Sequence, residues 1–323
     1  MSSADKTKDL VFAVDLGGTH LRAAAVDEIG QIRFRHKQTT PHDSCEQVVH
    51  AIVEAAKNWQ DESSEKNVLS AVCVVVPGTV NIATGKVITA PNLPCLDGFE
   101  LGGALQNALQ LPVLIENDAN AAAVGEMWQG AARGYRTIVC LTLGTGVGGG
   151  IILDGKVWHG ANDTAGEIGH ATVEPSGVEC KCGNRGCLEV YASATAIVRM
   201  TRAAIPSHPS SMLGTESELT AEKIYRAALS GDELALEVLQ SAGRYLGIGL
   251  ANIVNVLNPE MIVIGGGVAN AWDIFAAEMN RQISERAFPL PVSQLKIVRA
   301  ECGDDAGVLG AARLAFCANA DPR

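Results

Sequence analysis

Apolar positions recur along this chain with two periods, and the same order of elements is expected twice. Three strand-like apolar runs precede an amphipathic helix, in which Val48, Ile52 and Ala56 recur at four-residue spacing and share one face. After about residue 137, three strand-like segments begin a second series without an obvious repeat of sequence. The pattern predicts an α/β protein of two βββαβα-type halves with a hinge. Strands are expected near 10 to 15, 20 to 27, 31 to 38, 68 to 76, 113 to 117, 137 to 143, 148 to 153, 156 to 159 and 260 to 264, and helices near 43 to 59, 101 to 110, after Tyr191, 220 to 229, 232 to 256 and from about 305.

The length of the chain favours the same division. At 323 residues the chain is nearly too long for a single hydrophobic core, so two lobes are expected. We place a small N-terminal α/β lobe at residues 1–117 and a larger α/β lobe at 118–304. The last helix, 305–323, has an amphipathic pattern that includes Val308 and Ala312. It is therefore expected to pack back onto the N-terminal lobe.

Composition and charge exclude several classes of protein. The chain is 47% hydrophobic with 34 glycines, which is typical of a soluble α/β protein with many turns. Its net charge is −11 and its basic residues do not cluster, so a nucleic-acid partner is disfavoured. No apolar stretch approaches the roughly 20 residues that span a bilayer, so membrane insertion is not expected. The polar start, Met1 to Lys6, does not resemble a signal peptide, and a cytoplasmic protein is expected.

Three glycine-rich loops each follow an apolar strand-like run. Glycine allows positive φ and close backbone approach, so such turns can present N–H groups to phosphate oxygens. Any one of them could be an ordinary turn, but three strand-terminal loops in one chain favour a shared nucleotide. The loops are Asp15-Leu16-Gly17-Gly18-Thr19, Gly144-Thr145-Gly146 and Gly265-Gly266-Gly267.

Two familiar nucleotide motifs do not explain these loops. Gly144-x-Gly146-x-x-Gly149 has the spacing of a dinucleotide-binding fingerprint, which must open a helix. Here aliphatic residues follow and then the turn pair Asp154-Gly155, so a β-hairpin is expected. A Walker A loop is absent as well.

Part of the cysteine content has the spacing of a metal site. Zinc takes four nitrogen and sulfur ligands tetrahedrally, and a Cys-x-Cys turn supplies two thiolates from a tight loop. A redox pair or a loop without metal are the alternatives. Glu167 and Glu189 flank the cluster, so the zinc is expected to shape a substrate pocket. The candidate ligands are His170, Cys180, Cys182 and Cys187, whereas Cys73, Cys140 and Cys317 lie among apolar neighbours and are expected to be buried.

Five motifs in order resemble the ROK family of sugar kinases, over about residues 10 to 315. The resemblance implies an actin-like, hexokinase-like two-lobe ATPase fold with ribonuclease H-like repeats, a hinge and an interlobe cleft for ATP and a hexose. It also implies Mg²⁺, a structural Zn²⁺ and a homodimer. The motifs are Asp15-Leu16-Gly17-Gly18-Thr19, Glu116-Asn117-Asp118, Leu143-Gly144-Thr145-Gly146-Val147-Gly148-Gly149-Gly150, Glu167-Ile168-Gly169-His170 and Cys180-x-Cys182-Gly183-x-x-Gly186-Cys187-Leu188-Glu189.

The resemblance also implies the roles of single residues. Asp118 would be the catalytic base, although a residue before Ala119 could instead cap a helix. His170 would place one ring nitrogen on zinc and turn the other to the sugar. Asp15 would position magnesium. The sugar ligands would be Gly78 through its backbone, Asn92, Asn117, Asp118, Glu167, His170 and Glu189, and the nucleotide would lie on Gly17, Gly18, Thr19, Gly144, Thr145, Gly146, Gly265, Gly266 and Gly267.

Substrate choice is less directly encoded. The stretch Ala90 to Pro94 resembles the glucokinase members, although Cys95-Leu96 replaces their usual Gly-Trp, and His20 replaces a common Asn or Lys. We predict 6-phosphorylation of glucose by ATP. The alternatives are a kinase of fructose, N-acetylmannosamine or N-acetylglucosamine, polyphosphate as donor, and a sugar-sensing regulator. ROK regulators carry an N-terminal DNA-binding extension, whereas the first strand is expected here by about residue 10.

Overall fold

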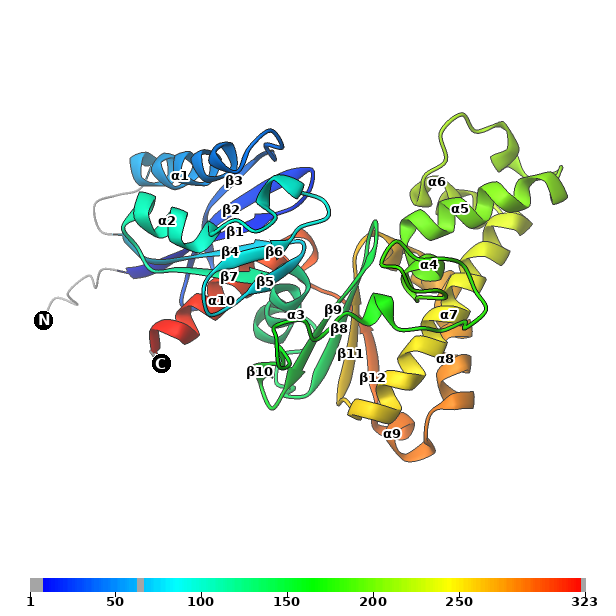
Figure 1. Ribbon diagram of the computed structural model, residues 1–323. Coiled ribbons are helices and arrows are strands. Elements are labelled where there is room, and N and C mark those ends of the chain that lie inside the picture. Colours follow the sequence, from blue (N-terminus) through cyan, green and yellow to red (C-terminus); the bar gives the residue numbers. More distant parts are fainter. Residues whose placement is uncertain (1–7, 63–66, 321–323) are drawn as a thin grey trace, which may run out of the picture.

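The computed structural model describes residues 8–62 and 67–320, which form two lobes side by side (Figure 1). Each lobe is built around a five-stranded sheet. The small-lobe sheet has the order β3-β2-β1-β4-β7 and the large-lobe sheet the order β10-β9-β8-β11-β12. In both, three antiparallel strands are followed by two parallel ones. The architecture is therefore repeated, as the sequence predicted.

The small-lobe elements agree closely with the predicted ones. The strands 20 to 27 and 113 to 117 have the predicted bounds, and the others differ by one or two residues. The segment after Gly78 forms a hairpin, β5–β6, where no strand was predicted. The elements are β1 Lys8–Leu16, β2 His20–Asp27, β3 Ile32–Thr39, α1 Cys45–Glu62, β4 Asn67–Val76, β5 Thr79–Asn81, β6 Lys86–Thr89, α2 Leu101–Leu109 and β7 Val113–Asn117.

The large lobe contains elements that were not predicted. They are the two helices and the edge strand between residues 272 and 299, a short helix that begins before Tyr191, and the helix that begins at Asp118, which the sequence suggested only as an alternative role for that residue. The elements are α3 Asp118–Gln129, β8 Ile138–Leu143, β9 Val147–Leu153, β10 Lys156–Val157, α4 Glu189–Ala192, α5 Ala194–Ala204, α6 Ala221–Leu229, α7 Glu233–Leu257, β11 Met261–Gly265, α8 Trp272–Arg286, α9 Pro289–Gln294, β12 Lys296–Arg299 and α10 Ala306–Ala320.

Both faces of the small-lobe sheet are covered, which explains the continuous apolar run in β1. Successive side chains on a strand point to opposite faces. Phe12 and Val14 pack with α1 and α2, while Val11 and Ala13 pack with α10. A strand buried on both faces lacks the alternation of a half-exposed strand. The large-lobe sheet is likewise covered by α4 to α8 on one face and by α3 on the other.

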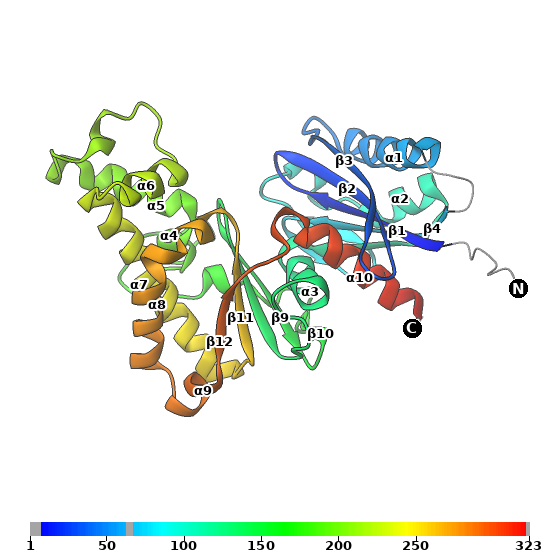
Figure 2. The same ribbon diagram turned by 180° about the vertical axis from the view of Figure 1, so that it is seen from behind.

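The helices α3 and α10 lie against each other between the two sheets (Figures 1 and 2). Helix α10 packs on β1 and β4, and α3 packs on β8 and β9. Their close approach depends on small residues, since a Cβ atom at Gly310 would clash with the carbonyl of Ala121. The end of the predicted helix, 321–323, and the polar start lie outside the described residues.

Burial was predicted for three cysteines and is found for two of them. Cys73 and Cys140 are buried in β4 and β8, whereas Cys317 is exposed. The prediction for Cys317 was wrong because α10 turns Val308, Ala312 and its other buried side chains to the sheet and leaves Cys317 on the other face. Among the described residues, no helix is long and apolar enough to cross a membrane.

Candidate functional site

Asp118 stands where β7 ends and α3 begins. The helix is capped mainly by its neighbour Asn117, whose Oδ1 accepts hydrogen bonds from the amides of Ala119 and Asn120 at 2.9 and 3.0 Å. Asp118 Oδ1 accepts a second bond from Ala119 at 2.8 Å. Its Oδ2 makes no hydrogen bond within the described residues. One carboxylate oxygen is therefore available for chemistry.

The surroundings of Asp118 raise the pKa of its carboxyl above the ordinary value of an aspartate. Burial is the main cause, the negative charge of Asp15 the next, and together they raise the pKa of Asp118 to about 7. The amide of Ala119 opposes this shift, and the charge of Glu167 adds to it. The structure thus brings together three carboxylates, Asp15, Asp118 and Glu167, that lie far apart in the sequence.

Asp15, the second-last residue of β1, lies next to a cationic partner. Burial raises the pKa of Asp15, and Arg22 works against that rise. Arg22 lies 3.5 Å from Asp15 through Nη1 and 3.3 Å from Asp304 through Nη2. Asp304 belongs to the segment that leads from the large lobe back to α10. The carboxylate of Asp15 is thus tied, through Arg22, to the connection between the lobes.

The first glycine loop is a tight turn fixed by hydrogen bonds. The Gly17 amide donates to the carbonyl of His20 at 3.0 Å, and Thr40 donates through its hydroxyl to Gly17 and through its amide to Thr19. Gly18 lies against Asn92, because a Cβ at Gly18 would stand 2.9 Å from the Asn92 Cβ. The first predicted phosphate loop and a predicted sugar ligand are therefore neighbours.

The second glycine loop turns its carbonyls toward α5. The carbonyl of Gly144 accepts from the Ala194 amide at 2.8 Å, and that of Thr145 accepts from the Thr195 hydroxyl at 2.8 Å. The amides of Thr145 and Gly146 donate no hydrogen bond within the described part of the chain. Free N–H groups in a glycine turn suit phosphate oxygens.

Glu189 supports the same loop from behind. Its Oε2 accepts from the Val147 amide at 3.0 Å, and a Cβ at Gly146 would clash with this carboxylate. Glu189 was predicted as a sugar ligand. The structure places one of its oxygens on the residue that follows the second glycine loop.

The third glycine loop requires glycine at its centre. Gly266 has φ 86°, and a Cβ there would clash with the backbone of Leu143. Gly265, Gly266 and Gly267 line a cavity of about 270 Å³, which also contacts Glu126 and Asp304. This loop therefore packs against the end of β8.

The remaining predicted sugar ligands lie near the start of α3. Asn117 Nδ2 donates to the Gly78 carbonyl at 3.0 Å, so both polar atoms of this amide are engaged. Glu167 Oε2 lies 3.8 Å from His170 Nε2. Asn92 is exposed beside the first glycine loop.

The four predicted metal ligands form one cluster. The candidate donor atoms of His170, Cys180, Cys182 and Cys187 all lie within 4.8 Å of one another. His170 Nδ1 is 3.7 Å from Cys180 Sγ, and Cys182 Sγ is 3.7 Å from Cys187 Sγ. A tetrahedral zinc with Zn–S bonds of about 2.3 Å has sulfurs about 3.8 Å apart, so the donor set fits this ion. The nitrogen that remains, Nε2, is the one near Glu167.

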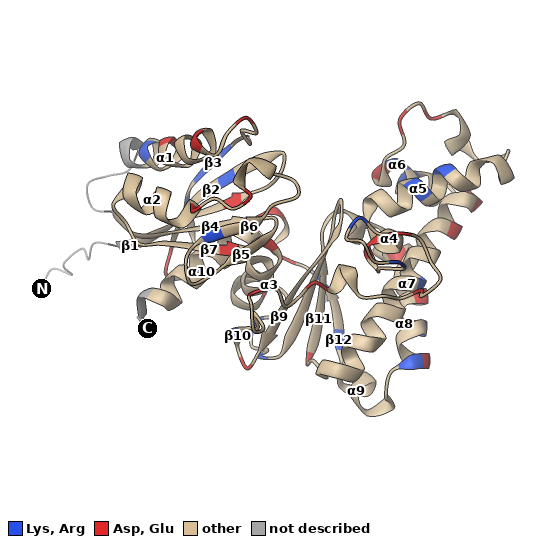
Figure 3. Ribbon diagram, viewed as in Figure 1, with Lys and Arg blue, Asp and Glu red and all other residues tan. Residues whose placement is uncertain are grey.

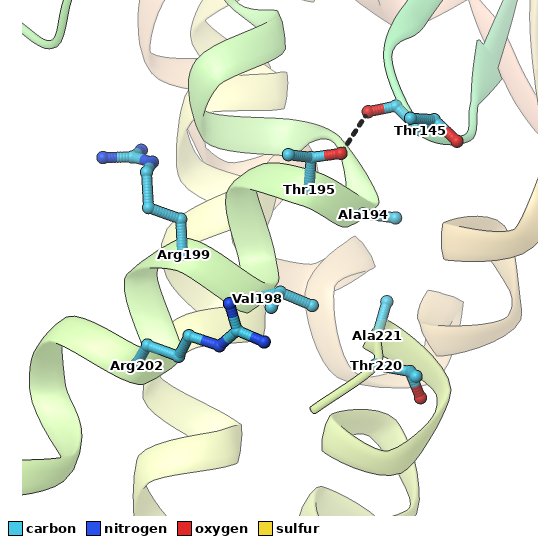
Figure 4. Close-up of a pocket in the computed structure, with 8 residues that line it drawn as sticks. All are labelled: Thr145, Ala194, Thr195, Val198, Arg199, Arg202, Thr220 and Ala221. Atoms are coloured by element: carbon cyan, nitrogen blue, oxygen red, sulfur yellow. Dashed lines mark hydrogen bonds between the residues drawn. The ribbon is translucent and has the colours of Figure 1, made fainter. Parts of the chain in front are cut away.

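A larger cavity adjoins the second glycine loop and was not predicted. Its volume is about 610 Å³, within the range of ligand sites. Figure 4 shows Arg202 turning its guanidinium toward Val198, while Arg199 points away from Ala221. Among the residues that the structure describes, no carboxylate lines the cavity. Acidic and basic residues are interspersed over the rest of the molecule (Figure 3). Its lining consists of Thr145, Ala194, Thr195, Val198, Arg199, Arg202, Thr220 and Ala221.

A buried histidine–carboxylate contact was also missed. Glu116, next to Asn117, is 4% exposed and lies 2.7 Å from His159 Nε2. Glu116 belongs to a motif that the sequence singles out, but no local pattern connects it to a residue 43 positions away. Such a contact depends on the fold and not on spacing.

Known proteins are similar to this chain over more than nine-tenths of its length. The glucokinase of Halalkalibacterium halodurans is 39% identical over 304 residues, 92% of each chain. The structure of a ROK family glucokinase from Streptomyces griseus with glucose and AMPPNP matches with TM-score 0.78 and 34% identity, covering 94% of this chain and 98% of the other. A ROK family transcriptional regulator, a homolog of the Escherichia coli MLC protein, matches with TM-score 0.87 and 32% identity, covering 96% and 78%.

The structural matches confirm the expected two-lobe, actin-like ATPase fold. The sequence profile of the ROK family matches residues 11–317, nearly the whole chain. It contains every predicted site residue, from Asp15 to Gly267. This chain belongs to the ROK family.

Proposed function

We propose that this chain is an ATP-dependent hexose kinase, and specifically a glucokinase that phosphorylates the 6-hydroxyl of glucose. The observation that carries the proposal is the carboxyl of Asp118, with a pKa of about 7, beside Asp15 and Glu167. A base is most effective when its pKa lies near the working pH. The high identity to glucokinases over nine-tenths of the chain supports glucose as the substrate.

Phosphoryl transfer depends mainly on positioning and on neutralising phosphate charge. Asp118 takes the proton of the attacking hydroxyl through its free Oδ2. The free amides of Thr145 and Gly146 hold phosphate oxygens. Mg²⁺, when bound with ATP, neutralises charge on the phosphates. It is usually held by one or two carboxylates, and Asp15 fits that role.

We propose that the hexose lies between Asn92, Asn117 and Glu167. Carboxylates and amides can each pair with neighbouring hydroxyls, and such a site rejects sugars that leave its polar groups unpaired. Asn117 holds the Gly78 carbonyl and the α3 amides, so its own position is rigid. The second oxygen of Glu189 remains for the sugar, because the first holds Val147.

We propose a structural zinc on His170, Cys180, Cys182 and Cys187. Ligation through Nδ1 fixes the ring of His170 and leaves Nε2 to the sugar and Glu167, 3.8 Å away. His170 and the three cysteines would hold the ion behind the acceptor site, where it would fix the shape of the site without contacting the transferred phosphate.

We propose that the 610 Å³ cavity receives the donor beyond its transferred phosphate. It begins at Thr145, and Arg199 and Arg202 are its only charged lining residues among those described. Arg202 makes no hydrogen bond or ion pair within the described residues. An unpaired guanidinium beside a phosphate loop favours an anionic donor such as ATP.

The test is release of ADP by the purified protein with Mg²⁺ and ATP, using glucose, mannose, fructose, N-acetylglucosamine and N-acetylmannosamine in turn. Selective turnover of glucose supports the proposal. Turnover of an acetylated sugar alone would retain the kinase but change its substrate. Light scattering on the same sample tests the expected homodimer, whose mass is twice 33.7 kDa.

A sugar-sensing regulator is the second candidate function, because the regulator structure has the higher TM-score, 0.87 against 0.78. A regulator binds sugar without consuming ATP. Saturable sugar binding with no turnover of any sugar would therefore favour it.

A further inference from the structure

The base and the acceptor carboxylate come from two separate segments of the chain. Asp118 follows β7, and Glu167 ends the loop formed by residues 158–167, here called the acceptor loop. A hexose held between them is phosphorylated efficiently only if both carboxylates keep their relative position, since misplacement by 1 Å can lower a rate about 100-fold. The contact between Glu116 and His159 connects the two segments.

Glu116 is the centre of this connection. Its Oε1 accepts from the amide of Asn117 at 2.8 Å and from Asn120 Nδ2 at 3.1 Å, and its Oε2 lies 2.7 Å from His159 Nε2. The side chain of Glu116 is 5% exposed and that of His159 27%. Glu116 therefore holds the backbone directly before Asp118 and, through its second oxygen, the start of the acceptor loop.

Asn120 gives independent evidence that this geometry is maintained at a cost. Its side chain is buried, and its Nδ2 is committed to Glu116. Its Oδ1 has no hydrogen-bond partner within the described residues and lies near Gly166 of the acceptor loop. An unpaired buried acceptor costs about 1–3 kcal/mol and calls for an explanation. Holding Glu116 in place provides one.

The acceptor loop is fixed at further points. The carbonyl of His159 accepts from the Ala165 amide at 3.0 Å, which closes the loop just before Glu167. Asp163 Oδ2 accepts from the amide of Ile82 at 3.1 Å, next to the small-lobe hairpin. His170, in the metal-ligand cluster, follows Glu167 by three residues. Glu167 thus lies between the His159 anchor and the metal-site anchor.

We propose that His159 and Glu116 are positioning residues, which hold Asp118 and Glu167 at the separation that a hexose requires. The inference rests on the proposed function of Asp118 and Glu167. Neither side chain needs to contact the reacting atoms. A purely structural role would affect stability alone, whereas a positioning role must also affect the hexose.

The test compares two variants. His159→Leu removes the hydrogen bond between His159 Nε2 and Glu116, whereas the Nε2 of His159→Gln can donate to Glu116 from a similar place. The matched control is His208→Leu. His208 is also 27% exposed and lies 3.2 Å from a glutamate, Glu237, but both belong to the large-lobe helices and their flanking loop. All variants are made in the full chain.

For His159→Leu we expect an increase of about tenfold or more in the KM for hexose, a lower kcat, and a KM for MgATP within about twofold of the wild type. His159→Gln and His208→Leu should keep all three values within about threefold. Hexose parameters unchanged in His159→Leu would overturn the proposal. So would the same losses in His159→Gln, because a restored hydrogen bond must restore the position.

Hydrogen exchange of the ligand-free protein separates this inference from the proposed function. Amides of residues 160–167 should exchange at least about tenfold faster in His159→Leu than in the wild type, with no change in His159→Gln. Unchanged exchange would overturn the proposal even in an active kinase. If these amides exchange faster in His159→Leu but the wild type turns over no hexose, the contact between His159 and Glu116 is supported as an anchor of the acceptor loop and the proposed function is contradicted.

Discussion

Replacing Asp118 with asparagine should make the ligand-free protein more stable while removing its activity. The pKa of Asp118 is raised from an ordinary 3.8 to about 7, first by burial and then by the charge of Asp15. Well below pH 3.8 the carboxyl is protonated in both the folded and unfolded chains. As the pH rises, the unfolded chain loses this proton first, so the folded state binds more protons and its stability falls until about pH 7.

The size of the effect follows from the same pKa. Each tenfold difference in proton affinity corresponds to about 1.4 kcal/mol. The rise in pKa from 3.8 to about 7 therefore lowers the free energy of unfolding by about 4 kcal/mol above pH 7. This value is an upper bound for the gain in Asp118→Asn, because asparagine can keep the hydrogen bond from the Ala119 amide but not every contact of the carboxylate. At pH 8 we expect Asp118→Asn to be more stable by about 2–4 kcal/mol, and the difference should fall below about 1 kcal/mol near pH 4.

The assay is urea unfolding at several pH values, without added magnesium, ATP or sugar. The matched control is Asp232→Asn. Burial alone would raise the pKa of Asp232, but bonds from the amides of Ala235 and Met212 and from Ser211 outweigh it and lower the pKa. This substitution should therefore destabilise the protein at pH 8. Equal stability of wild type and Asp118→Asn at pH 8 would refute the electrostatic account of the site.

Three further substitutions test separate parts of the site. Cys182→Ser should lower the zinc content from about one per chain, by elemental analysis, and weaken sugar binding in calorimetry; a variant that keeps both would contradict the metal assignment. Arg202→Gln should raise the KM for MgATP about threefold or more and leave the KM for sugar unchanged; an unchanged donor KM would remove the cavity from the donor site. Gly266→Ala should lower the thermal midpoint strongly, because its φ is 86° and a Cβ would clash with Leu143. Its control, Gly103→Ala on α2, where a Cβ has open space, should stabilise by about 0.5–1 kcal/mol.

The fold was predictable where the hydrophobic pattern is strong. The strands at 20 to 27 and 113 to 117 match their predicted bounds, since apolar runs with clear turn signals define them. The segment 272–299 was not predicted: α9 opens with Pro289 and is exposed, and β12 is a four-residue edge strand. Such elements are stabilised by neighbours that a linear pattern does not reveal.

The site was predictable where its residues are close in sequence. The metal-ligand cluster assembles as its spacing predicts, because a short loop brings the three cysteines together. The N-cap of α3 is Asn117, whereas the sequence suggested Asp118. The two residues are adjacent and both are common caps, so the sequence alone does not distinguish them. The partners Glu189 and Val147 are 42 residues apart, and their contact follows from the packing of α4 on the loop before β9. The roles of these residues in binding and transfer stay predictions.

The most direct test of the account is the pH dependence of glucose phosphorylation by the wild type and by Asp118→Asn. The kcat/KM of the wild type should rise about tenfold per pH unit and level off above about pH 7, as Asp118 loses its proton. The asparagine variant should be slower by about 100-fold or more, with no such rise. A variant that keeps the wild-type rate, or the same pH profile, would show that Asp118 is not the base.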